Sequence, residues 1–487
     1  MAGWPGRPTP RFPTLEIRHR RTVFPGHLPG DVTPYEHDRG KFHPGGLLGR
    51  QPGANLPPMR TTSLGPSLRH LGLLLVADVA SACAGRPAPS AATLEPRGPA
   101  VLLVSLDGFR PDYVDPEVTP HLARLAERGV RAEALIPSFP TKTFPNHYTL
   151  VTGLRPDSHG LVANNVWDPD MEAQFGLGDR EAVGDPVWYG GEPVWVTAER
   201  RGMTTAPLFW PGSEAPIGGV RPTHWMPYDG GMPHRDRVEW VLARLAGDVG
   251  PAVGFATLYF DDVDGAGHRF GPAAPETRAA AARVDSALGI LLTGLEGRAL
   301  DHVNLMVVSD HGMSPLSRDR VIFLDDYIDP EATTVVDWNP VLAVWPDPAG
   351  VDSIYEALRG THPHLHVYRP DEIPERYEFG SHDRVAPIIG IADPGWSITT
   401  HESFDRNPGR YQGGNHGYDQ MSEDMQALFI AVGPAFRQGA VVPPFPNVDV
   451  YELIMHVLGL PPAPGDGRLD RVKGVLAAAP NNAGEGS

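Results

Sequence analysis

The sequence predicts an α/β fold with a doubly wound, mostly parallel central sheet, flanking helices and inserted loops. Short continuous apolar runs end in Asp or Gly, a pattern typical of strands that are covered on both faces. Helical patterns alternate with these runs, which favours parallel strands joined by crossover helices. Apolar residues make up 41% of the 487 residues, which is enough for a sizeable core.

The first elements follow a Pro-rich stretch. VLLVSLDG at 101–108 is an apolar run that ends in Asp and a Gly turn, so it predicts a buried strand. VTPHLARLAERG at 118–129 has helical spacing and a terminal Gly. VGFATLYFDD at 253–262 is the next buried-strand candidate, and it too ends in aspartates.

The later elements continue this alternation. ETRAAAARVDSALGILLTGLEG at 276–297 predicts a long amphipathic helix, and VNLMVVSDHG at 303–312 and ALFIAVGP at 427–434 predict buried strands. The Pro- and Gly-rich residues 361–420 are expected to form inserted loops or a small subregion. Residues 100–480 contain no internal repeat or linker pattern and are expected to form one domain; residues 481–487 are a tail.

The N-terminal residues differ in character. Residues 1–58 are rich in Pro, Gly and Arg and have no sustained period, so they are expected to be disordered or a non-native extension upstream of Met59. Residues 59–83 combine arginines, a short apolar stretch and small residues before the sole cysteine, Cys83. This plan is typical of a bacterial export signal of the lipoprotein type. Residues 84–99 then form a flexible tether.

The signal segment predicts an exported, periplasmic protein that is anchored to a membrane only through a lipid on Cys83. The apolar stretch is too short to span a bilayer as a helix. Asp78 within this stretch and Ala80 before the cysteine depart from the lipoprotein pattern, so ordinary signal cleavage is the alternative. A buried helix with a passive cysteine is a further alternative.

Charge and cysteine content exclude several classes of site. The net charge of −18 argues against a surface that binds duplex nucleic acid by releasing counterions. A small anionic substrate stays compatible with this charge, because bound metal ions supply local positive charge. A single cysteine excludes internal disulfides and a Cys-based zinc cluster, so any metal site must use His and carboxylates.

One set of polar side chains calls for a joint explanation, because several of its members follow predicted strands. Each alone has an ordinary structural reading, as a helix cap, a turn or a hydrogen-bonded histidine. Together, carboxylates, imidazoles and a hydroxyl suit two zinc-like ions that clamp a phosphoryl group. The set comprises Asp107, Thr143, Asp264, His268, Asp310, His311 and His416.

The segment TKTFPNHYTLVTGLRPDSHG at 141–160 places hydroxyl, amide and imidazole groups close together. It predicts either a polar loop before a helix or a nucleophile with supporting groups. Thr141 is expected to be a cap or turn residue. His147 is expected to pack beneath the nucleophile or to bond a backbone carbonyl, and His159 to lie in a turn.

The ordered motifs LDGFRPDY, PTKTFPNHYTLVTGLRPDSHG, GGEPVWVTAE, FWPGSE, YFDDVDGAGHRFGP, SDHGM and NHGYD carry a family resemblance. The chain resembles the nucleotide pyrophosphatase/phosphodiesterase family of the alkaline phosphatase superfamily, and the export signal suggests a bacterial member. The resemblance runs from about Val101 to about Gly467. It implies an alkaline phosphatase-like fold and makes residues 100–480 a catalytic phosphodiesterase domain.

The resemblance also implies the roles of individual residues. Thr143 matches the nucleophile, and Asn164, or its neighbour Asn165, matches a contact to a phosphate oxygen. Gly265 and Glu214 depart from residues common in the family; the first touches no ligand, and the second leaves fine specificity open. Two Zn²⁺ sites are implied, one from Asp264, His268 and His416 and the other from Asp107, Thr143, Asp310 and His311. Substrate-binding positions are matched by Phe144, Tyr228, Tyr259, Trp210 and Pro211.

The implied chemistry is hydrolysis of phosphodiester or pyrophosphate bonds of nucleotides. A cation that binds Thr143 makes its hydroxyl a competent nucleophile, and attack on phosphorus gives a phosphothreonine intermediate. Asn164 stabilises charge on the phosphoryl oxygens, and a nucleoside 5′-monophosphate is released. The sequence leaves open the physiological substrate and the oligomeric state.

Other functions stay open alongside the hydrolysis of nucleotides. Within the same superfamily these are a choline- or lipid-type phosphodiesterase and a phosphomonoesterase. A sulfatase is disfavoured, because the sole cysteine lies in the signal segment. A non-enzymatic alternative is a metal-stabilised surface lipoprotein that acts as a binding module, which the intact set of ligand and nucleophile residues argues against.

Overall fold

The computed structural model describes residues 98–478. The predicted extension, signal segment with Cys83 and C-terminal tail lie outside the described residues and stay predictions. Within residues 98–478, no helix combines the length and apolar character needed to cross a membrane.

A seven-stranded sheet forms the centre of the fold. Neighbouring strands pair in parallel except at β17, which runs antiparallel to both of its neighbours. The prediction of a mostly parallel sheet is therefore confirmed. In order, the strands are β18 (Ala440–Val442), β2 (Val130–Ala132), β17 (Phe429–Val432), β8 (Val303–Val308), β1 (Ala100–Leu106), β7 (Phe255–Phe260) and β6 (Thr205–Pro207).

The direction of β17 was not predicted, since 427–434 was expected only to be a buried strand of a mostly parallel sheet. Phe429 at the start of β17 pairs with Val308 at the end of β8. The chain thus re-enters the sheet at the carboxyl edge of β8 without a crossover helix. A strand that starts at that edge must run back across the sheet, antiparallel to β8.

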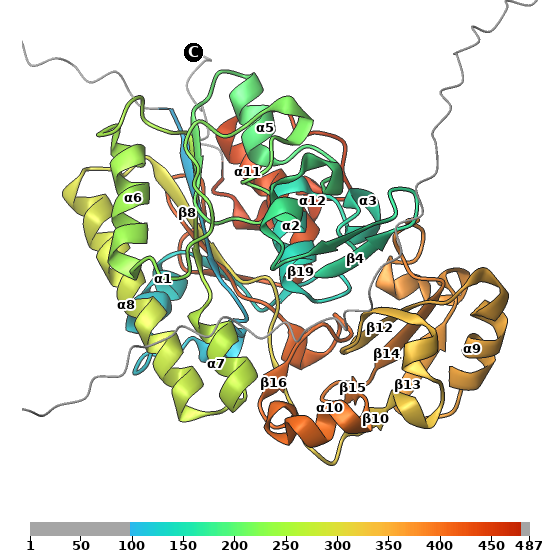
Figure 1. The fold of residues 1–487 in the computed structure, drawn as a ribbon. Helices are drawn as coiled ribbons and strands as arrows, with labels where there is room; N and C mark the ends of the chain where they lie inside the picture. The colour runs from blue at the N-terminus through green and yellow to red at the C-terminus, as the bar shows by residue number, and fades with distance from the viewer. Residues whose placement is uncertain (1–97, 479–487) are drawn as a thin grey trace, which may run out of the picture. The chain divides into compact units, whose positions relative to one another are not determined.

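Helices cover both faces of the central sheet (Figure 1). Alternate residues of β1 point to opposite faces, as strand geometry requires, so Leu102 and Leu103 enter different cores. One core contains α1 (Pro120–Arg128), α6 (His234–Ala246) and α8 (Pro275–Gly297). The other contains α2 (Thr143–Thr152), α5 (Val194–Arg200) and α11 (Val450–Leu458).

A second, smaller sheet lies in the sequence between β8 and β17. It is antiparallel and packs with α9 (Val351–Leu358) around its own apolar core. We call residues 321–411 the insert. The small subregion expected over 361–420 therefore begins earlier and includes a sheet. The strands in order are β11 (Thr334–Asp337), β12 (Val341–Trp345), β14 (Ile388–Ala392) and β13 (Leu365–Tyr368).

Candidate active site

The predicted polar residues meet at the carboxyl edge of the central sheet. Asp107 directly follows β1, and Asp310 lies just beyond β8. Asp264 lies on α7 (Asp262–Phe270), which begins where β7 ends. Thr143 is the first residue of α2. Ligands of open α/β sheets bind at this edge because the strands leave their following loops there.

The first group of side chains is buried and closely spaced. Asp107, Asp310 and His311 each offer one ligand atom, and these atoms lie within 4.8 Å of one another. His311 Nε2 lies 3.0 Å from Asp310 Oδ2 and 3.6 Å from Asp107 Oδ1. Thr143 Oγ1 lies 3.4 Å from the same His311 Nε2, so the predicted nucleophile borders this group.

The second group is formed by Asp264, His268 and His416, whose ligand atoms also lie within 4.8 Å of one another. His416 Nε2 lies 3.1 Å from His268 Nε2 and 3.6 Å from Asp264 Oδ1. The His416 ring stacks on His311 with centroids 3.6 Å apart, so the two groups adjoin. The structure therefore assembles both predicted sets, although their members come from distant parts of the chain.

Backbone contacts orient each of the histidines. The Nδ1 atoms of His268, His311 and His416 lie 2.8–3.0 Å from the carbonyl oxygens of Gly414, Gly312 and Thr141, respectively. A carbonyl only accepts, so each Nδ1 carries the proton and each Nε2 presents a lone pair to the group. This arrangement is typical of histidines that bind a metal through Nε2.

The carboxylates have the electrostatic character of a cation site. Asp107 Oδ1, Asp264 Oδ1 and Asp310 Oδ2 are buried and accept no hydrogen bond among the described residues. Burial raises the pKa of Asp107 well above its ordinary value, and the charge of Asp310 adds to this rise. Burial likewise raises the pKa of Asp264. Uncompensated buried carboxylate oxygens facing histidine lone pairs fit divalent cations with mixed Asp and His ligands.

Further residues hold the carboxylates in place. The Tyr259 hydroxyl donates to Asp107 Oδ2 at 2.6 Å, and the backbone N–H of Gly108 donates to Asp310 Oδ1 at 3.2 Å. His147 is fully buried, and its Nδ1 lies 2.9 Å from the Thr143 carbonyl oxygen and 3.3 Å from Asp310 Oδ2. Of the two alternatives expected for His147, the bond to a backbone carbonyl is confirmed.

Comparisons with known proteins agree with this geometry. Residues 101–419 match the family model described as type I phosphodiesterase / nucleotide pyrophosphatase. The chain belongs to this family. It is accordingly a hydrolase of phosphodiester or pyrophosphate bonds.

Similar relatives come from eukaryotes. Human ectonucleotide pyrophosphatase/phosphodiesterase family member 5 is 38% identical over 392 residues, which are 80% of this chain and 80% of that protein. Mouse bis(5′-adenosyl)-triphosphatase is 37% identical over 382 residues, 78% of this chain and 81% of that protein. A rat relative, family member 1, is longer: the chain spans 44% of it at 38% identity.

A solved structure of the murine family member 5 matches the fold with a TM-score of 0.74 at 38% identity. The match covers 78% of this chain and all of that chain. A second murine structure, described as an inactive threonine-to-alanine variant in complex with AMP, matches equally well. The alkaline phosphatase-like fold expected from the resemblance is thus confirmed.

In the present chain, the segment before Thr143 holds the loop that contains His416. The Thr141 carbonyl accepts from His416 Nδ1 at 2.8 Å, and its hydroxyl accepts from Gly417 N at 2.9 Å. Thr141 is therefore a structural bridge, as expected, but between distant segments. His159 ends the short helix α3 (Pro156–His159) rather than lying in a turn, and it is buried, with its Nδ1 accepting from Leu161 N at 3.2 Å.

Asn164 and Asn165 face different neighbours. Asn164 Oδ1 accepts the backbone N–H of Phe144 at 3.0 Å, so its amide lies beside the residue after Thr143. Asn165 starts the hairpin strand β4 (Asn165–Asp168) and pairs with Gly176. The geometry favours Asn164 for the predicted contact to a phosphate oxygen, because only its side chain bonds the start of α2.

The predicted aromatic residues fall into two groups by exposure. Phe144 and Tyr228 are partly buried, so each offers some ring surface. The Tyr228 hydroxyl donates to Asp261 Oδ2 at 2.9 Å, and its backbone N–H donates to Glu214 Oε1 at 3.0 Å. Glu214 also pairs with Arg180, so the residue that departs from the family pattern anchors the Tyr228 loop.

Trp210, Pro211 and Tyr259 are buried. The Trp210 indole N–H donates to the His147 carbonyl at 2.9 Å, and its ring meets the His147 ring edge-on. Their predicted role in a substrate pocket stays a prediction. Burial favours a supporting role for them, since Trp210 contacts His147 and the Tyr259 hydroxyl donates to Asp107.

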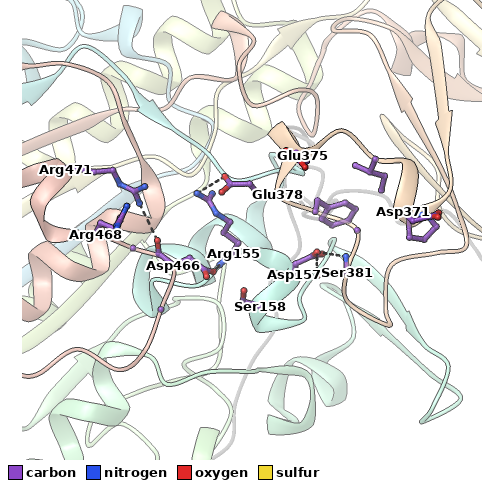
Figure 2. Close-up of a pocket in the computed structure, with 16 residues that line it drawn as sticks. Arg155, Asp157, Ser158, Asp371, Glu375, Glu378, Ser381, Asp466, Arg468 and Arg471 are labelled. Carbon is purple, nitrogen blue, oxygen red and sulfur yellow. Dashed lines mark hydrogen bonds and ion pairs between the residues drawn. The ribbon is translucent and has the colours of Figure 1, made fainter.

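A separate cavity of about 900 Å³ lies elsewhere and contains none of the predicted site residues. Figure 2 shows it between the segments 155–158, 370–381 and 465–471. Charges of both signs line it and pair with one another, as Arg155 does with Glu378. It marks a seam between the insert and the rest of the fold.

Proposed function

We propose that this chain cleaves nucleotides and dinucleotides through a phosphothreonine intermediate on Thr143 and releases nucleoside 5′-monophosphates. The observation that carries the proposal is the position of Thr143 Oγ1, 3.4 Å from His311 Nε2 in the buried ligand group of Asp107, Asp310 and His311. The hydroxyl beside the ligand group thus belongs to a chain of the phosphodiesterase/nucleotide pyrophosphatase family, which supports a role in cleaving phosphorus–oxygen bonds.

The reaction takes two displacements at phosphorus. Thr143 Oγ1 attacks the phosphorus and loses its proton, while the bond from phosphorus to the leaving oxygen breaks. Water then cleaves the new bond between phosphorus and Thr143, which restores the hydroxyl and releases the monophosphate. The Asn164 amide, fixed through its Oδ1, directs its N–H donors toward charge that develops on the phosphoryl oxygens.

The cofactors that we propose are two Zn²⁺ ions, because mixed imidazole and carboxylate ligands favour zinc over the hard cations. Asp264, His268 and His416 would hold one ion, and Asp107, Asp310, His311 and the Thr143 oxygen the other. When bound, the ions supply positive charge that favours the ionised hydroxyl of Thr143 and offsets charge on the phosphoryl group.

The names of the relatives support nucleotides as the substrates. One solved relative is described as inactive after a threonine-to-alanine change and as a complex with AMP, and another relative is named for bis(5′-adenosyl)-triphosphate. The Lys142 ammonium, the cation adjacent to Thr143 in sequence, pairs with Asp337. Because this ion pair neutralises Lys142, its ammonium does not offset the second negative charge of a phosphate monoester. This favours a diester as the substrate.

An assay with aryl leaving groups tests the proposal. The full chain with zinc is compared on an aryl ester of thymidine 5′-monophosphate, a simple aryl phosphate and an aryl phosphorylcholine. We expect the highest kcat/KM on the nucleotide ester and a loss of activity in Thr143→Ala. A preference for the simple phosphate would establish a monoesterase, and one for phosphorylcholine a choline- or lipid-type diesterase. Full diesterase activity in Thr143→Ala would exclude the covalent mechanism.

We also propose that the protein is an exported bacterial lipoprotein, anchored through Cys83. The segment 59–83 supports this, and the prefix "ecto" in the names of the relatives fits an exported enzyme. Mass spectrometry of the N-terminal peptide of the cellular protein tests it. A lipid-modified Cys83 is expected, whereas an unmodified cysteine or peptides from residues 1–58 would contradict the anchor or the start at Met59.

A further inference from the structure

Lys142, directly before the proposed nucleophile, is a buried cation with a partner in the insert. Its Nζ donates to Asp337 Oδ2 at 2.5 Å and to the Asn339 carbonyl at 3.2 Å. The side chains of Lys142 and Asp337 are only 7% and 8% exposed. Because Lys142 is the N-cap residue of α2, this ion pair fixes the backbone from which Thr143 projects.

The same residues pack against the loop of the second ligand group. A methyl group at Gly417, next to His416, would lie 2.7 Å from Pro340 Cδ and 3.1 Å from Lys142 Cε. Only glycine fits so close an approach, and its φ of 109° also suits glycine. The insert, the Lys142 stem and the His416 loop are therefore in direct contact.

The three residues of the Thr-Lys-Thr sequence, 141–143, thus each bond a different part of the structure. Thr141 bonds the His416 imidazole and the Gly417 backbone N–H, Lys142 bonds the insert, and Thr143 presents its hydroxyl to His311 of the first ligand group. A buried ion pair contributes little net stability, but loss of one partner leaves an uncompensated charge that the structure relieves by moving.

We propose that the insert positions the nucleophile through the Lys142–Asp337 ion pair. Lys142 and Asp337 are positioning residues in this proposal, since they act through the backbone of Thr143 and not on the substrate. The proposal rests on the proposed function of Thr143. It assigns to the insert a part in catalysis, although the insert contributes no member of either ligand group.

Other contacts between the insert and the rest of the fold, those that line the cavity in Figure 2, are exposed and lie away from Thr143 in the sequence. The Arg155–Glu378 pair in Figure 2 has an N–O distance of 2.7 Å, but the Glu378 side chain is 51% exposed. Asp157 Oδ2 accepts from Ser381 N and Oγ in the same region. Exposed pairs of this kind contribute little, and none adjoins Thr143 in the sequence.

The chain offers a matched control in Asp168 and Arg384. Arg384 Nε lies 2.7 Å from Asp168 Oδ2, and the two side chains are 9% and 11% exposed. This pair also joins the insert to another part of the fold, the strand β4, and in each pair the second Asp oxygen accepts from nearby backbone N–H groups. It differs in that neither of its members adjoins Thr143 in the sequence, so it reports the structural cost of breaking such a pair.

The test compares Asp337→Asn with Asp168→Asn in the full, zinc-loaded chain. We expect Asp337→Asn to lower kcat on the thymidine ester by about 10- to 100-fold with little change in KM, as for a misplaced reacting group. Asp168→Asn should lower Tm by a similar amount and keep its kcat. Equal kcat values in the two variants, or a loss in Asp337→Asn that appears only in KM, would overturn the proposal.

A double variant keeps the test decisive if Asp337→Asn folds poorly. Lys142→Met combined with Asp337→Asn removes both charges, so it should recover Tm while its kcat equals that of the less active of the two single variants, Lys142→Met and Asp337→Asn. Wild-type kcat in the double variant, or additive losses, would show that the pair does not position Thr143. If Thr143→Ala instead stays active, the proposed function fails independently of these results.

Discussion

Tyr259 contributes its hydroxyl to the site, since the ring is buried and the hydroxyl donates to Asp107 Oδ2. Tyr259→Phe removes this donor and leaves the shape of the core. We expect a loss of kcat/KM of about 10- to 100-fold and weaker zinc binding, the usual effect of removing a group that orients a metal ligand. Steady-state kinetics and zinc titration by calorimetry measure both effects.

Tyr355→Phe is the matched control for this change. The Tyr355 hydroxyl also donates to a carboxylate, Glu372, at 2.6 Å, but within the insert. Its loss should leave zinc affinity and kcat/KM unchanged. If Tyr259→Phe binds zinc as tightly as Tyr355→Phe does, the hydroxyl has no part in holding Asp107.

His159 predicts a pH dependence of stability that is separate from catalysis. Burial lowers the pKa of His159 from 6.5 to about 3, so the folded chain keeps it neutral where the unfolded chain protonates it. Its contribution is fully present above pH 6.5 and is lost as the pH falls toward 3. Between pH 6.5 and 5 we expect a loss of roughly 1–2 kcal/mol in the free energy of unfolding.

Urea denaturation at several pH values compares the wild type with His159→Gln. The variant lacks the ionisable group, so its free energy of unfolding should fall less steeply over this range, whatever its stability at pH 7. Identical slopes in the two proteins would mean that His159 is accessible to protons in the folded state.

At the scale of elements, the start of α2 is held by a buried amide network. Asn146 Oδ1 accepts from Ser138 N and Asn447 Nδ2, and Asn146 Nδ2 donates to the carbonyls of Pro140 and Lys142. All four of its hydrogen-bonding positions are used, so it fastens the loop before Thr143 to the helix. This role explains the amide in TKTFPNHY without a catalytic function.

Asn146→Ala should therefore destabilise the fold. The change leaves buried donors and acceptors without partners, and we expect a loss on the order of 3 kcal/mol in the free energy of unfolding. The urea midpoint reports it, and Asn407→Ala, at the exposed C-cap of α10 (His401–Arg406), is the control. A midpoint equal to that of Asn407→Ala would contradict the network as a source of stability.

At the scale of the molecule, the two ligand groups draw on β1, β7, β8, α7 and the NHGYD loop, so bound cations would join distant segments. Removal of metal with a chelator should lower Tm, because a ligand that binds only the folded state stabilises it by about 2.7 kcal/mol at a hundredfold excess over its Kd. Added Zn²⁺ should restore the original Tm. Differential scanning calorimetry measures the change.

Asp264→Asn is the control for metal removal. It weakens one ligand group, so the difference in Tm between the zinc-loaded and chelated protein should be smaller than in the wild type. An equal difference in both proteins would place the stabilising ion elsewhere in the chain.

Much of the fold and the site could be predicted, because both depend on local patterns. The apolar runs that became β1, β7 and β8 end at Asp107, Asp261 and Asp310, and a parallel sheet must bring such ends to one edge. The members of both predicted ligand groups follow from this rule and from the motifs of the family. The direction of β17 did not follow, since an apolar run has no polarity of its own.

The partners of the site residues could not be predicted. Tyr259 and Asp107 are 152 residues apart, and Lys142 and Asp337 are 195 residues apart. Tyr259 lies within an apolar strand run, so the sequence offered no sign that its hydroxyl would donate to Asp107. Lys142 could equally have extended into solvent or toward a phosphate.

By itself, the sequence determined the class of the fold, the family and the residues capable of nucleophilic and metal chemistry, because periodicity and short motifs are properties of neighbouring residues. The tertiary structure alone decided how Thr141, Lys142 and Thr143 divide their contacts among the His416 loop, the insert and the ligand groups. Those contacts join segments that only packing brings together, and burial sets which hydrogen bonds must form.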